Sequence, residues 1–588
     1  MSIEFSTRRF HLGLTACGWA GMVAGGLVAL ALVALDSLQA AEPEGEELLR
    51  EQLAAGEFAP ALKSADAAPP NERDRWLSSI AQAQAGAGEK SGSLSTAGQI
   101  RDDLTRDRTL DDVMRQPPGG AQGGGGTADF QSLIELITST IAPTSWDEVG
   151  GPGAIQEYRN GVYVDTLGVV RRIAPEDLGN GPLAKLRRSA ERRLAADDVR
   201  RASPLRKISL PRLEREIQLR MAAGRPLDEE MSVLAGLQRI KYVLIYPETG
   251  DLVLAGPAGD WKLDRENRLA SSDTGRPVVQ LDDLVLLLRH VSHSRDGEFG
   301  CSINPTDEGL AKAQAFLQES SKKPIKAGGR GKWLEQLRSQ LGRQTIEVFG
   351  IDPRSRVAHA IVEADYRMKL VGIGLEKGTL DVPSYLESIK VPAGQAPPPM
   401  NVLRWWFTVN YDAVKASRDR DVYELNGQGV KVLSENELLA AGGKRIHMGE
   451  SDELNSQFAY NFTKHFPELA VKYPVYADLQ NIFDLALTAS LIKAEGLADR
   501  VGWHMLAFGD PERYPLAQGH APAAVETVVN HRVVNRVHVL AAVSGGVTAD
   551  CSSLVKDQAI QLDGKGALGS ERERSKPEQV AHASWWWD

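Results

Sequence analysis

IEVFGIDPRSRVAHAIVEADYRMKL, residues 346–370, is the stretch that decides the fold. Its opening is rich in β-branched and aromatic residues and favours a strand. Asp352 and Pro353 then break the strand and predict a helix start, with Asp352 as N-cap and the proline in the first turn. Apolar residues follow at helical spacing, namely Val357, Ile361 and Ala364. We therefore expect a strand, a turn and a helix, followed by a second strand at residues 371–374.

The segments before this unit alternate between strand and helix patterns. Residues 242–246 and 251–255 flank a Pro-Glu-Thr-Gly turn and predict a hairpin. Residues 281–291 predict an apolar helix, and Thr306 is well placed to cap another. Such alternation indicates a layered sheet with covering helices, and the order of its strands stays open.

The segments after the unit extend the same pattern. Residues 402–409 predict a strand, with antiparallel neighbours at 422–425 and 429–433. A helix with a stripe of apolar residues should kink or end at Pro467. Residues 475–493 are apolar nearly all round, which predicts a buried helix. Two late strands should end at Ser544-Gly545-Gly546.

The first forty residues carry the features of an export signal. Arg8 and Arg9 precede a long apolar run at residues 13–35, and Ala40 ends a plausible cleavage site. The paired arginines resemble a twin-arginine signal, and the general export pathway is the alternative. The run also has the length of an uncleaved inner-membrane anchor. A lipoprotein box ending at Cys17 is a further alternative, although the main apolar run comes after that cysteine.

The length of 588 residues is too great for one hydrophobic core. We predict an α+β protein with mixed sheets and covering helices in its C-terminal half, a basic helical segment before them, and a disordered N-terminal linker and C-terminal tail. The expected division is an export signal or anchor at 1–40, a low-complexity linker at 41–126, a small helix-hairpin module at 127–173, a basic helical segment at 174–238, an α+β core at 239–555 and a disordered tail at 556–588.

Two parts of the chain resemble known families. The small module contains Ile141-Ala142-Pro143-Thr144-Ser145-Trp146 and a Gly-Gly-x-Gly turn, and it resembles a module found near secretin-type envelope proteins of planctomycete bacteria. Residues 240–555, with the segments VEADYRMKL at 362–370, LRWWF at 403–407 and NFTKHF at 461–466, look like a family of secreted planctomycete proteins of unknown function. This resemblance implies export and a shared fold, and it offers no catalytic residues to carry over.

The net charge of −10 argues against a specific nucleic-acid binder. The basic segment at 174–238 would suit an envelope protein or another anionic surface partner. Its arginines also have acidic neighbours, so a solvated helix face with internal ion pairs is the alternative. A membrane contact is expected only through residues 13–35, if they stay uncleaved. We expect no cofactor.

No motif with specific chemistry stands out. His359 and Glu363 share a helix face, but the sequence has no His-Glu-x-x-His and no cysteine pair with zinc spacing, so we predict no metal site. Ser544 lacks the Gly-x-Ser-x-Gly context of a nucleophile. Glu435 with Glu437 is a carboxylate pair of a kind that hydrolases use, although such pairs are common. Cys301 and Cys551 would form one disulfide after export or remain two small buried residues.

Two functions remain. The first is an exported envelope or extracellular protein, periplasmic or secreted, that serves as a binding or structural module. The second is a hydrolase with a site assembled from distant residues, and the candidates for it are Glu363, Asp365, His465 and His531. A histidine close to one of these carboxylates would favour the enzyme. Salt bridges from the carboxylates to Arg367 or Lys369 would favour the binding module, which we prefer.

Overall fold

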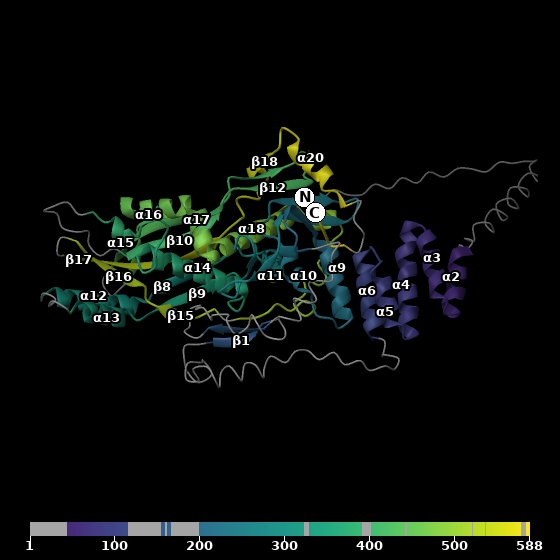
Figure 1. Ribbon diagram of the computed structural model, residues 1–588, viewed down its shortest axis with the longest axis horizontal. Helices are drawn as coiled ribbons and strands as arrows, with labels where there is room; N and C mark the ends of the chain where they lie inside the picture. Colours follow the sequence, from purple (N-terminus) through teal and green to yellow (C-terminus); the bar gives the residue numbers. More distant parts are fainter. Residues whose placement is uncertain are drawn as a thin grey trace, which may run out of the picture.

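The computed structural model describes residues 44–115, 154–158, 161–165, 199–322, 329–390, 402–440, 444–519, 521–534, 537–577 and 584–588. Within these ranges the chain folds into helices and mixed sheets, which confirms the predicted α+β class (Figure 1). The predicted signal at 1–40 lies outside the described residues. So does most of the 127–173 module, apart from an antiparallel hairpin of β1 (Ala154–Tyr158) and β2 (Gly161–Asp165).

The larger of the two main sheets contains eight strands. Their order is β14-β13-β10-β17-β8-β9-β15, and β16 pairs with β17 outside this path. The strands are β8 (Phe299–Pro305), β9 (Arg343–Phe349), β10 (Val402–Asn410), β13 (Gly429–Leu439), β14 (Arg445–His447), β15 (Ala524–Glu526), β16 (Val529–Val534) and β17 (Val537–Ala549). The β10–β17 pairing is parallel and the other pairings in this sheet are antiparallel, so the sheet is mixed.

Four helices cover one face of this sheet: α14 (Arg356–Gly372), α16 (Glu453–Lys464), α17 (Phe466–Lys472) and α18 (Pro474–Ala494). Aromatic side chains fill the space between the layers. The centroids of the Trp405 and Phe458 rings lie 4.2 Å apart, and those of the Phe407 and Phe462 rings lie 5.7 Å apart. Helix α18 is buried from Val475 to Ile492, as its all-round apolar pattern predicts. The break at Pro467 is confirmed, because α16 ends and α17 begins there.

The fold-deciding stretch forms β9 and α14, with two differences from the prediction. The N-cap of α14 is Ser355, whose hydroxyl accepts the N–H of Ala358 at 3.1 Å. Asp352 instead accepts the N–H of Arg354 in the preceding turn. Residues 371–374 form no strand, because α14 continues to Gly372. The absence of a side chain at Gly372 lets the Trp405 ring pack there, since a Cβ would lie 2.1 Å from it.

Further helices pack around this layer. Helix α11 (Leu281–His293) packs against α18. Helix α12 (Asp307–Ser321) packs against α13 (Arg330–Leu341) in a small apolar cluster that also includes Val529 of β16. Thr306 caps α12 as predicted, since its hydroxyl accepts the N–H of Gly309 at 3.0 Å. Short helices complete the set, namely α10 (Glu229–Ser232), α15 (Tyr385–Ser388), α19 (Leu497–Arg500), η2 (Leu234–Gly236) and η4 (Asp557–Ala559).

The second main sheet has seven strands in the order β18-β11-β12-β4-β5-β3-β19. They are β3 (Ser203–Ser209), β4 (Tyr242–Tyr246), β5 (Asp251–Ala258), β11 (Ala413–Ala416), β12 (Val422–Asn426), β18 (Ile560–Leu562) and β19 (Trp586–Trp587). The β4–β5 hairpin is confirmed. The expected neighbour at 422–425 is β12, which pairs with β4 and β11 rather than with β10. The predicted basic helical segment is wrong at its described end, because β3 precedes α9 (Leu210–Ala222).

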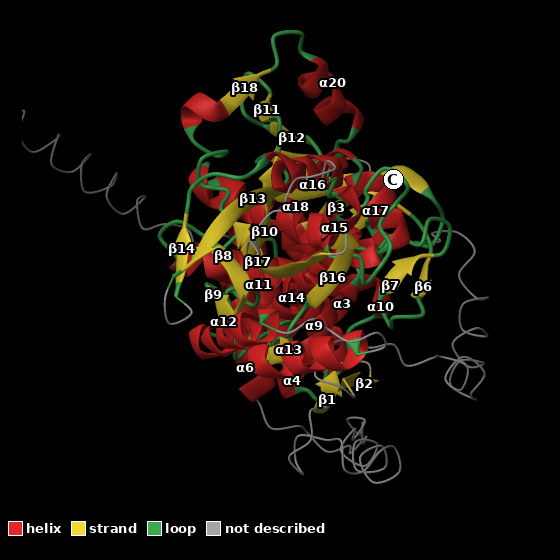
Figure 2. Cartoon of the chain, turned by 90° about the vertical axis from the view of Figure 1, so that its left-hand side faces the viewer, coloured by secondary structure: helices red, strands yellow, loops and turns green. Residues whose placement is uncertain are grey.

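The predicted disordered tail at 556–588 is ordered where it is described. Strand β18 pairs with β11 at one edge of the seven-stranded sheet, and β19 pairs with β3 at the other edge. Helix α20 (Ala567–Arg574) lies between them in sequence and contributes Leu568 to the apolar cluster on the outer face of the sheet. Figure 2 shows β18 and α20 side by side above β11 and β12. We call β18, α20 and residues 584–588 the strap.

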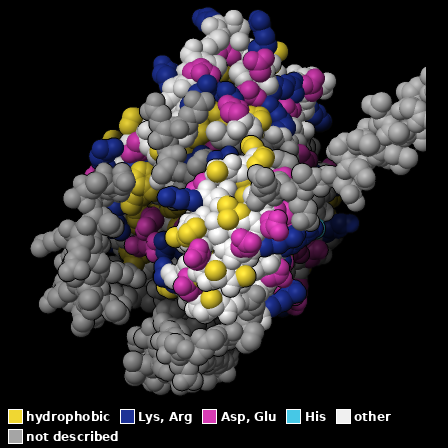
Figure 3. Space-filling view, turned by 90° about the vertical axis from the view of Figure 1, so that its right-hand side faces the viewer, with side chains coloured by type: hydrophobic (Ala, Val, Ile, Leu, Met, Phe, Trp, Pro, Cys, Tyr) yellow, Lys and Arg dark blue, Asp and Glu magenta, His cyan; other side chains and the backbone are white. Residues whose placement is uncertain are grey.

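The predicted low-complexity linker at 41–126 is also corrected. Residues 44–115 form α2 (Glu44–Ala54), α3 (Phe58–Ala67), α4 (Pro70–Gly86), α5 (Lys90–Ala97) and α6 (Asp103–Arg115). The alanines in this region are small enough to let the helices pack closely, and Ala61, Ala65 and Ala81 are fully buried. Helix α6 packs against α9, so this helical unit is joined to the α+β body. Figure 3 views the molecule from the end where this helical unit lies, and the surface there carries apolar side chains interspersed with charges of both signs.

Candidate functional site

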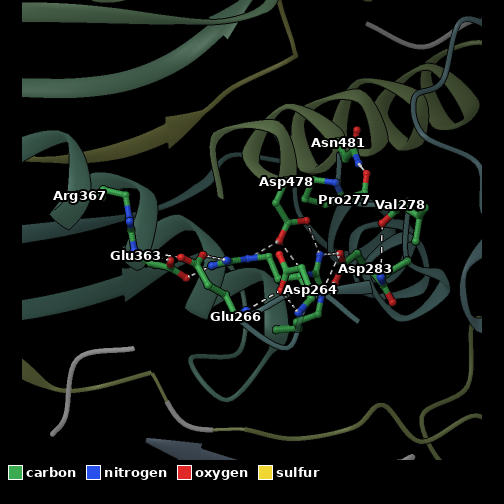
Figure 4. Close-up of polar contacts among 12 residues, drawn as sticks. Asp264, Glu266, Pro277, Val278, Asp283, Glu363, Arg367, Asp478 and Asn481 are labelled. Atoms are coloured by element: carbon green, nitrogen blue, oxygen red, sulfur yellow. Dashed lines mark hydrogen bonds and ion pairs between the residues drawn. The ribbon is translucent and has the colours of Figure 1, made fainter. Parts of the chain in front are cut away.

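The predicted acidic candidate Glu363 lies in a buried network of charges. Three arginines and four carboxylates make up this network: Arg268, Arg356, Arg367, Glu266, Asp283, Glu363 and Asp478. Figure 4 shows Arg367 and Glu363 at one end of the network and Asp478 and Asp283 toward the other. The side chains come from α11, α14, α18 and the turn between β6 (Trp261–Leu263) and β7 (Leu269–Ser271).

Arg268 is the centre of the network. Its guanidinium donates to both Glu266 and Glu363, and its Nε lies 3.9 Å from Asp478 Oδ2. Only 10% of its side chain is exposed. The carboxylate of Asp264 holds the turn by accepting the N–H groups of Glu266 and Arg268 at 2.7 and 2.9 Å. The turn between two short strands therefore places one charge among three carboxylates.

Arg356 connects Asp283 with Asp478. Its Nε lies 3.0 Å from Asp283, and its two terminal nitrogens lie 2.8 and 3.0 Å from Asp478. Although burial opposes this shift, Arg356 and then Arg268 hold the pKa of Asp478 below its usual value. Burial raises the pKa of Asp283 to about 6 against the opposing charge of Arg356. The pKa values of the two carboxylates shift in opposite directions because Asp478 has a second arginine, Arg268, nearby.

The raised pKa of Asp283 predicts an unusual pH dependence. Between about pH 4 and 6 the folded state holds a proton that the unfolded state has lost, so the free energy of unfolding should fall as pH rises through this window. The Asp283→Asn variant should lose this contribution, which amounts to roughly 3 kcal/mol across the window. Urea unfolding of both proteins at several pH values from about 4 to 7 measures it. Parallel curves for the two proteins would contradict the prediction.

Asp365, the second candidate, forms a separate buried pair. Its Oδ2 accepts a hydrogen bond from Lys369 Nζ at 2.6 Å, and both side chains are fully buried. Lys369 also donates to the carbonyl of Ile303 in β8 at 2.9 Å. Burial raises the pKa of Asp365 and lowers the pKa of Lys369. The pair fastens α14 to the eight-stranded sheet.

The two histidine candidates are not brought to these acids. His465 lies between α16 and α17, where its Nδ1 is 3.6 Å from Glu468. His531 lies in β16 opposite Leu540, and its side chain falls outside the described part of the chain. Among the described contacts, neither Glu363 nor Asp365 has a histidine partner.

An acid–histidine cluster does occur at the β13–β14 edge of the larger sheet. His447 Nδ1 lies 3.3 Å from Glu435 and 3.2 Å from Glu437, and 59% of the histidine side chain is exposed. Arg404 pairs with Glu435 at 2.8 Å. Both glutamates stand out in the sequence as a carboxylate pair, whereas His447 carries no such local signal. The hairpin pairing of Glu437 with His447 was the signal that could have found it.

Ser544 belongs to the same cluster rather than to a catalytic loop. The structure contradicts the expected strand end at 544–546, because β17 runs on to Ala549 and Ser544 is fully buried within it. Its hydroxyl donates to Glu437 Oε2 at 2.8 Å. Glu437 thus stands between the serine and the histidine, whereas a catalytic triad needs the histidine in the middle.

Several arginines at the described end of the basic segment have acidic partners within the molecule. Arg200 pairs with Asp260 at 2.7 Å, Arg212 with Asp251 at 2.7 Å, and Arg220 with Glu216 at 2.9 Å. These pairs agree with the alternative of internal ion pairs.

Cys301 and Cys551 are buried free thiols.

The described residues contain neither a metal-binding cluster nor a helix that could span a membrane. No group of three or more His, Cys, Asp or Glu side chains in them is arranged to hold a metal ion. In the same residues, no helix has both the length and the apolar character needed to cross a bilayer. The predicted anchor at 13–35 lies outside them.

Fold and site together define an α+β protein whose apolar interior contains buried ion pairs. Residues 301–385 match one protein family, described as a protein of unknown function (DUF1598). The matched region runs from β8 through α12, α13, β9 and α14, and it includes the fold-deciding stretch with Glu363, Asp365 and Lys369. No curated protein and no solved structure matches the chain.

Proposed function

We propose that the protein is an exported envelope or extracellular protein that acts by binding, and that its candidate acids have a structural role. The observation that carries this proposal is the bonding of Glu363 to Arg268 and of Asp365 to Lys369. A general acid or base must exchange a proton with a substrate. A carboxylate held by a buried cation is poorly suited to that exchange, whereas it is well suited to fixing helices around a sheet that presents a binding surface.

Export is supported by the sequence. Arg8 and Arg9 precede the apolar run at 13–35, which is the order of a charged and an apolar region in an export signal. The resemblance of residues 240–555 to secreted planctomycete proteins, and of the 127–173 module to modules near secretin-type proteins, supports the same location.

Replacing Arg8 and Arg9 together with lysine tests the export route. The paired substitution should leave the full-length chain in the cytosol if the twin-arginine route is used, because that route requires the arginine pair. Fractionation of the producing cells with an antibody to the chain measures this, and Arg50→Lys is the control. The proposal of export is wrong if the unaltered chain is itself recovered intact and unprocessed from the cytosol.

The cluster of Glu435, Glu437 and His447 favours a hydrolase as the second candidate function. An imidazole whose Nδ1 faces carboxylates can take a proton from water through its other nitrogen. The His447→Asn variant decides between the two functions in assays with model esters, phosphate esters and glycosides. Equal and negligible turnover by both proteins supports binding. A turnover that only the unaltered protein shows would establish the hydrolase.

A further inference from the structure

Residues 584–588, Ser-Trp-Trp-Trp-Asp, lie against the outer edge of β3. The N–H of Ser209 donates to the carbonyl of Trp585 at 2.9 Å. Trp586 and Trp587 then pair with Ile208 and Lys207 in antiparallel register. This is the geometry by which an extended peptide adds a strand to a sheet. The ladder covers two residue pairs, so most of the recognition must come from side chains.

Arg206 recognises the acidic end of the segment. Its Nε and Nη2 bind the two carboxylate oxygens of Asp588 at 2.8 and 2.9 Å. The remaining donors of the guanidinium bind the carbonyls of Val199, Arg201 and Ala235. The Arg206 side chain is fully buried. Because these three carbonyls belong to the body of the protein, Arg206 is held in place independently of Asp588.

The three tryptophans occupy both faces of the sheet edge. Trp585 and Trp586 pack against the main core, and Trp586 also lies under the Arg206 guanidinium at 4.6 Å. Trp587 enters the apolar cluster on the opposite face, beside Leu568 of α20, and its indole N–H donates to the carbonyl of Ser575. Trp586 and Trp587, the two residues of β19, thus reach opposite faces of the sheet, as neighbouring residues of a strand do.

We propose that the β3 edge is a binding site for an extended peptide of the type Trp-Trp-Asp, and that the chain's own 584–588 segment occupies it reversibly. The site consists of the β3 backbone, the fixed guanidinium of Arg206 and the apolar side chains that pack against the tryptophans on each face. It is independent of the proposed export and binding function, because its contacts use residues other than those of the ionic network and of the Glu435–Glu437–His447 cluster.

A variant that lacks residues 584–588 tests the site with a fluorescein-labelled Ser-Trp-Trp-Trp-Asp peptide. Anisotropy should show saturable binding with one peptide per chain. A peptide with asparagine in place of the aspartate should bind at least tenfold more weakly, because it loses a charge-assisted bidentate contact. Arg225 is an exposed arginine just after α9, so Arg225→Met in the shortened chain is the control and should change the affinity less than twofold. Absence of binding to a folded shortened chain, or equal affinity for the two peptides, would overturn the proposal.

Hydrogen exchange on the full chain decides the matter if the shortened variant does not fold. Amides in the β3–β19 ladder should exchange at least a hundredfold faster than those in the β4–β5 hairpin of the same sheet, because a reversible segment opens locally. The Asp588→Asn substitution should widen this difference. Equal protection of the two ladders would identify 584–588 as a fixed part of the fold and reject the proposal.

Discussion

Replacing Lys369 with methionine is expected to lower the free energy of unfolding by about 3–5 kcal/mol, because removing one partner of a buried ion pair leaves the other charge without compensation. The variant also loses the bond from α14 to the Ile303 carbonyl of β8. Urea denaturation followed by circular dichroism measures the effect as a lower midpoint with an unchanged slope.

The double variant Asp365→Leu with Lys369→Met should recover most of this loss, since well-packed apolar residues often replace a buried ion pair without penalty. The control is the pair of Lys312 with Glu308 on α12. It has the same helical spacing and the same 2.6 Å distance as the pair of Lys369 with Asp365, but its side chains are 56% and 76% exposed. Lys312→Met should leave the midpoint where it was. Equal effects of the two lysine substitutions would mean that burial is not the source of the stabilisation.

Replacing Arg268 with methionine should cost about 3–5 kcal/mol, because Glu266, Glu363 and Asp478 would keep their negative charges at close range in a buried setting. Arg268→Lys should rescue only a small part of the loss. An ammonium group is a compact charge and cannot form the planar fork with which the guanidinium binds two carboxylates.

Thermal unfolding of the two Arg268 variants measures this cost. Arg354→Met is the control for the loss of an arginine from a turn, because Arg354 pairs with Asp352 at 2.9 Å where both side chains face solvent. A melting temperature that falls equally in the Arg354 and Arg268 variants would contradict the central role of Arg268.

The sequence patterns identified those elements whose burial is uniform or strictly periodic. The β4–β5 hairpin, α11 and α18 follow from local patterns, and so does the cap at Thr306. The order of strands in the larger sheet did not follow. Strand β17 lies between β10 and β8, and such pairing depends on contacts far apart in the chain. The strap was not predictable because its two edge strands, Ile560–Leu562 and Trp586–Trp587, are very short and pair with strands far away in the sequence.

The candidate site was predictable only in part for the same reason. Lys369 lies four residues after Asp365 and Arg367 four residues after Glu363, so helical spacing already indicated both pairs. Arg268 lies 95 positions from Glu363, and no local pattern connects them. The histidines were chosen by residue type alone. His447 needed the register of the β13–β14 hairpin to be known.

The strap also sets the order in which the molecule is completed during translation. Arg206 and Asp588 are 382 positions apart, so at about 5–20 residues per second the ribosome makes the second partner roughly 20–80 seconds after the first. Throughout that time β3 has a free edge and Arg206 has no carboxylate. A chain that has not yet reached residue 584 therefore exposes an unpaired strand edge of the kind that can pair with other chains, and residues 584–588 cover this edge once they are made.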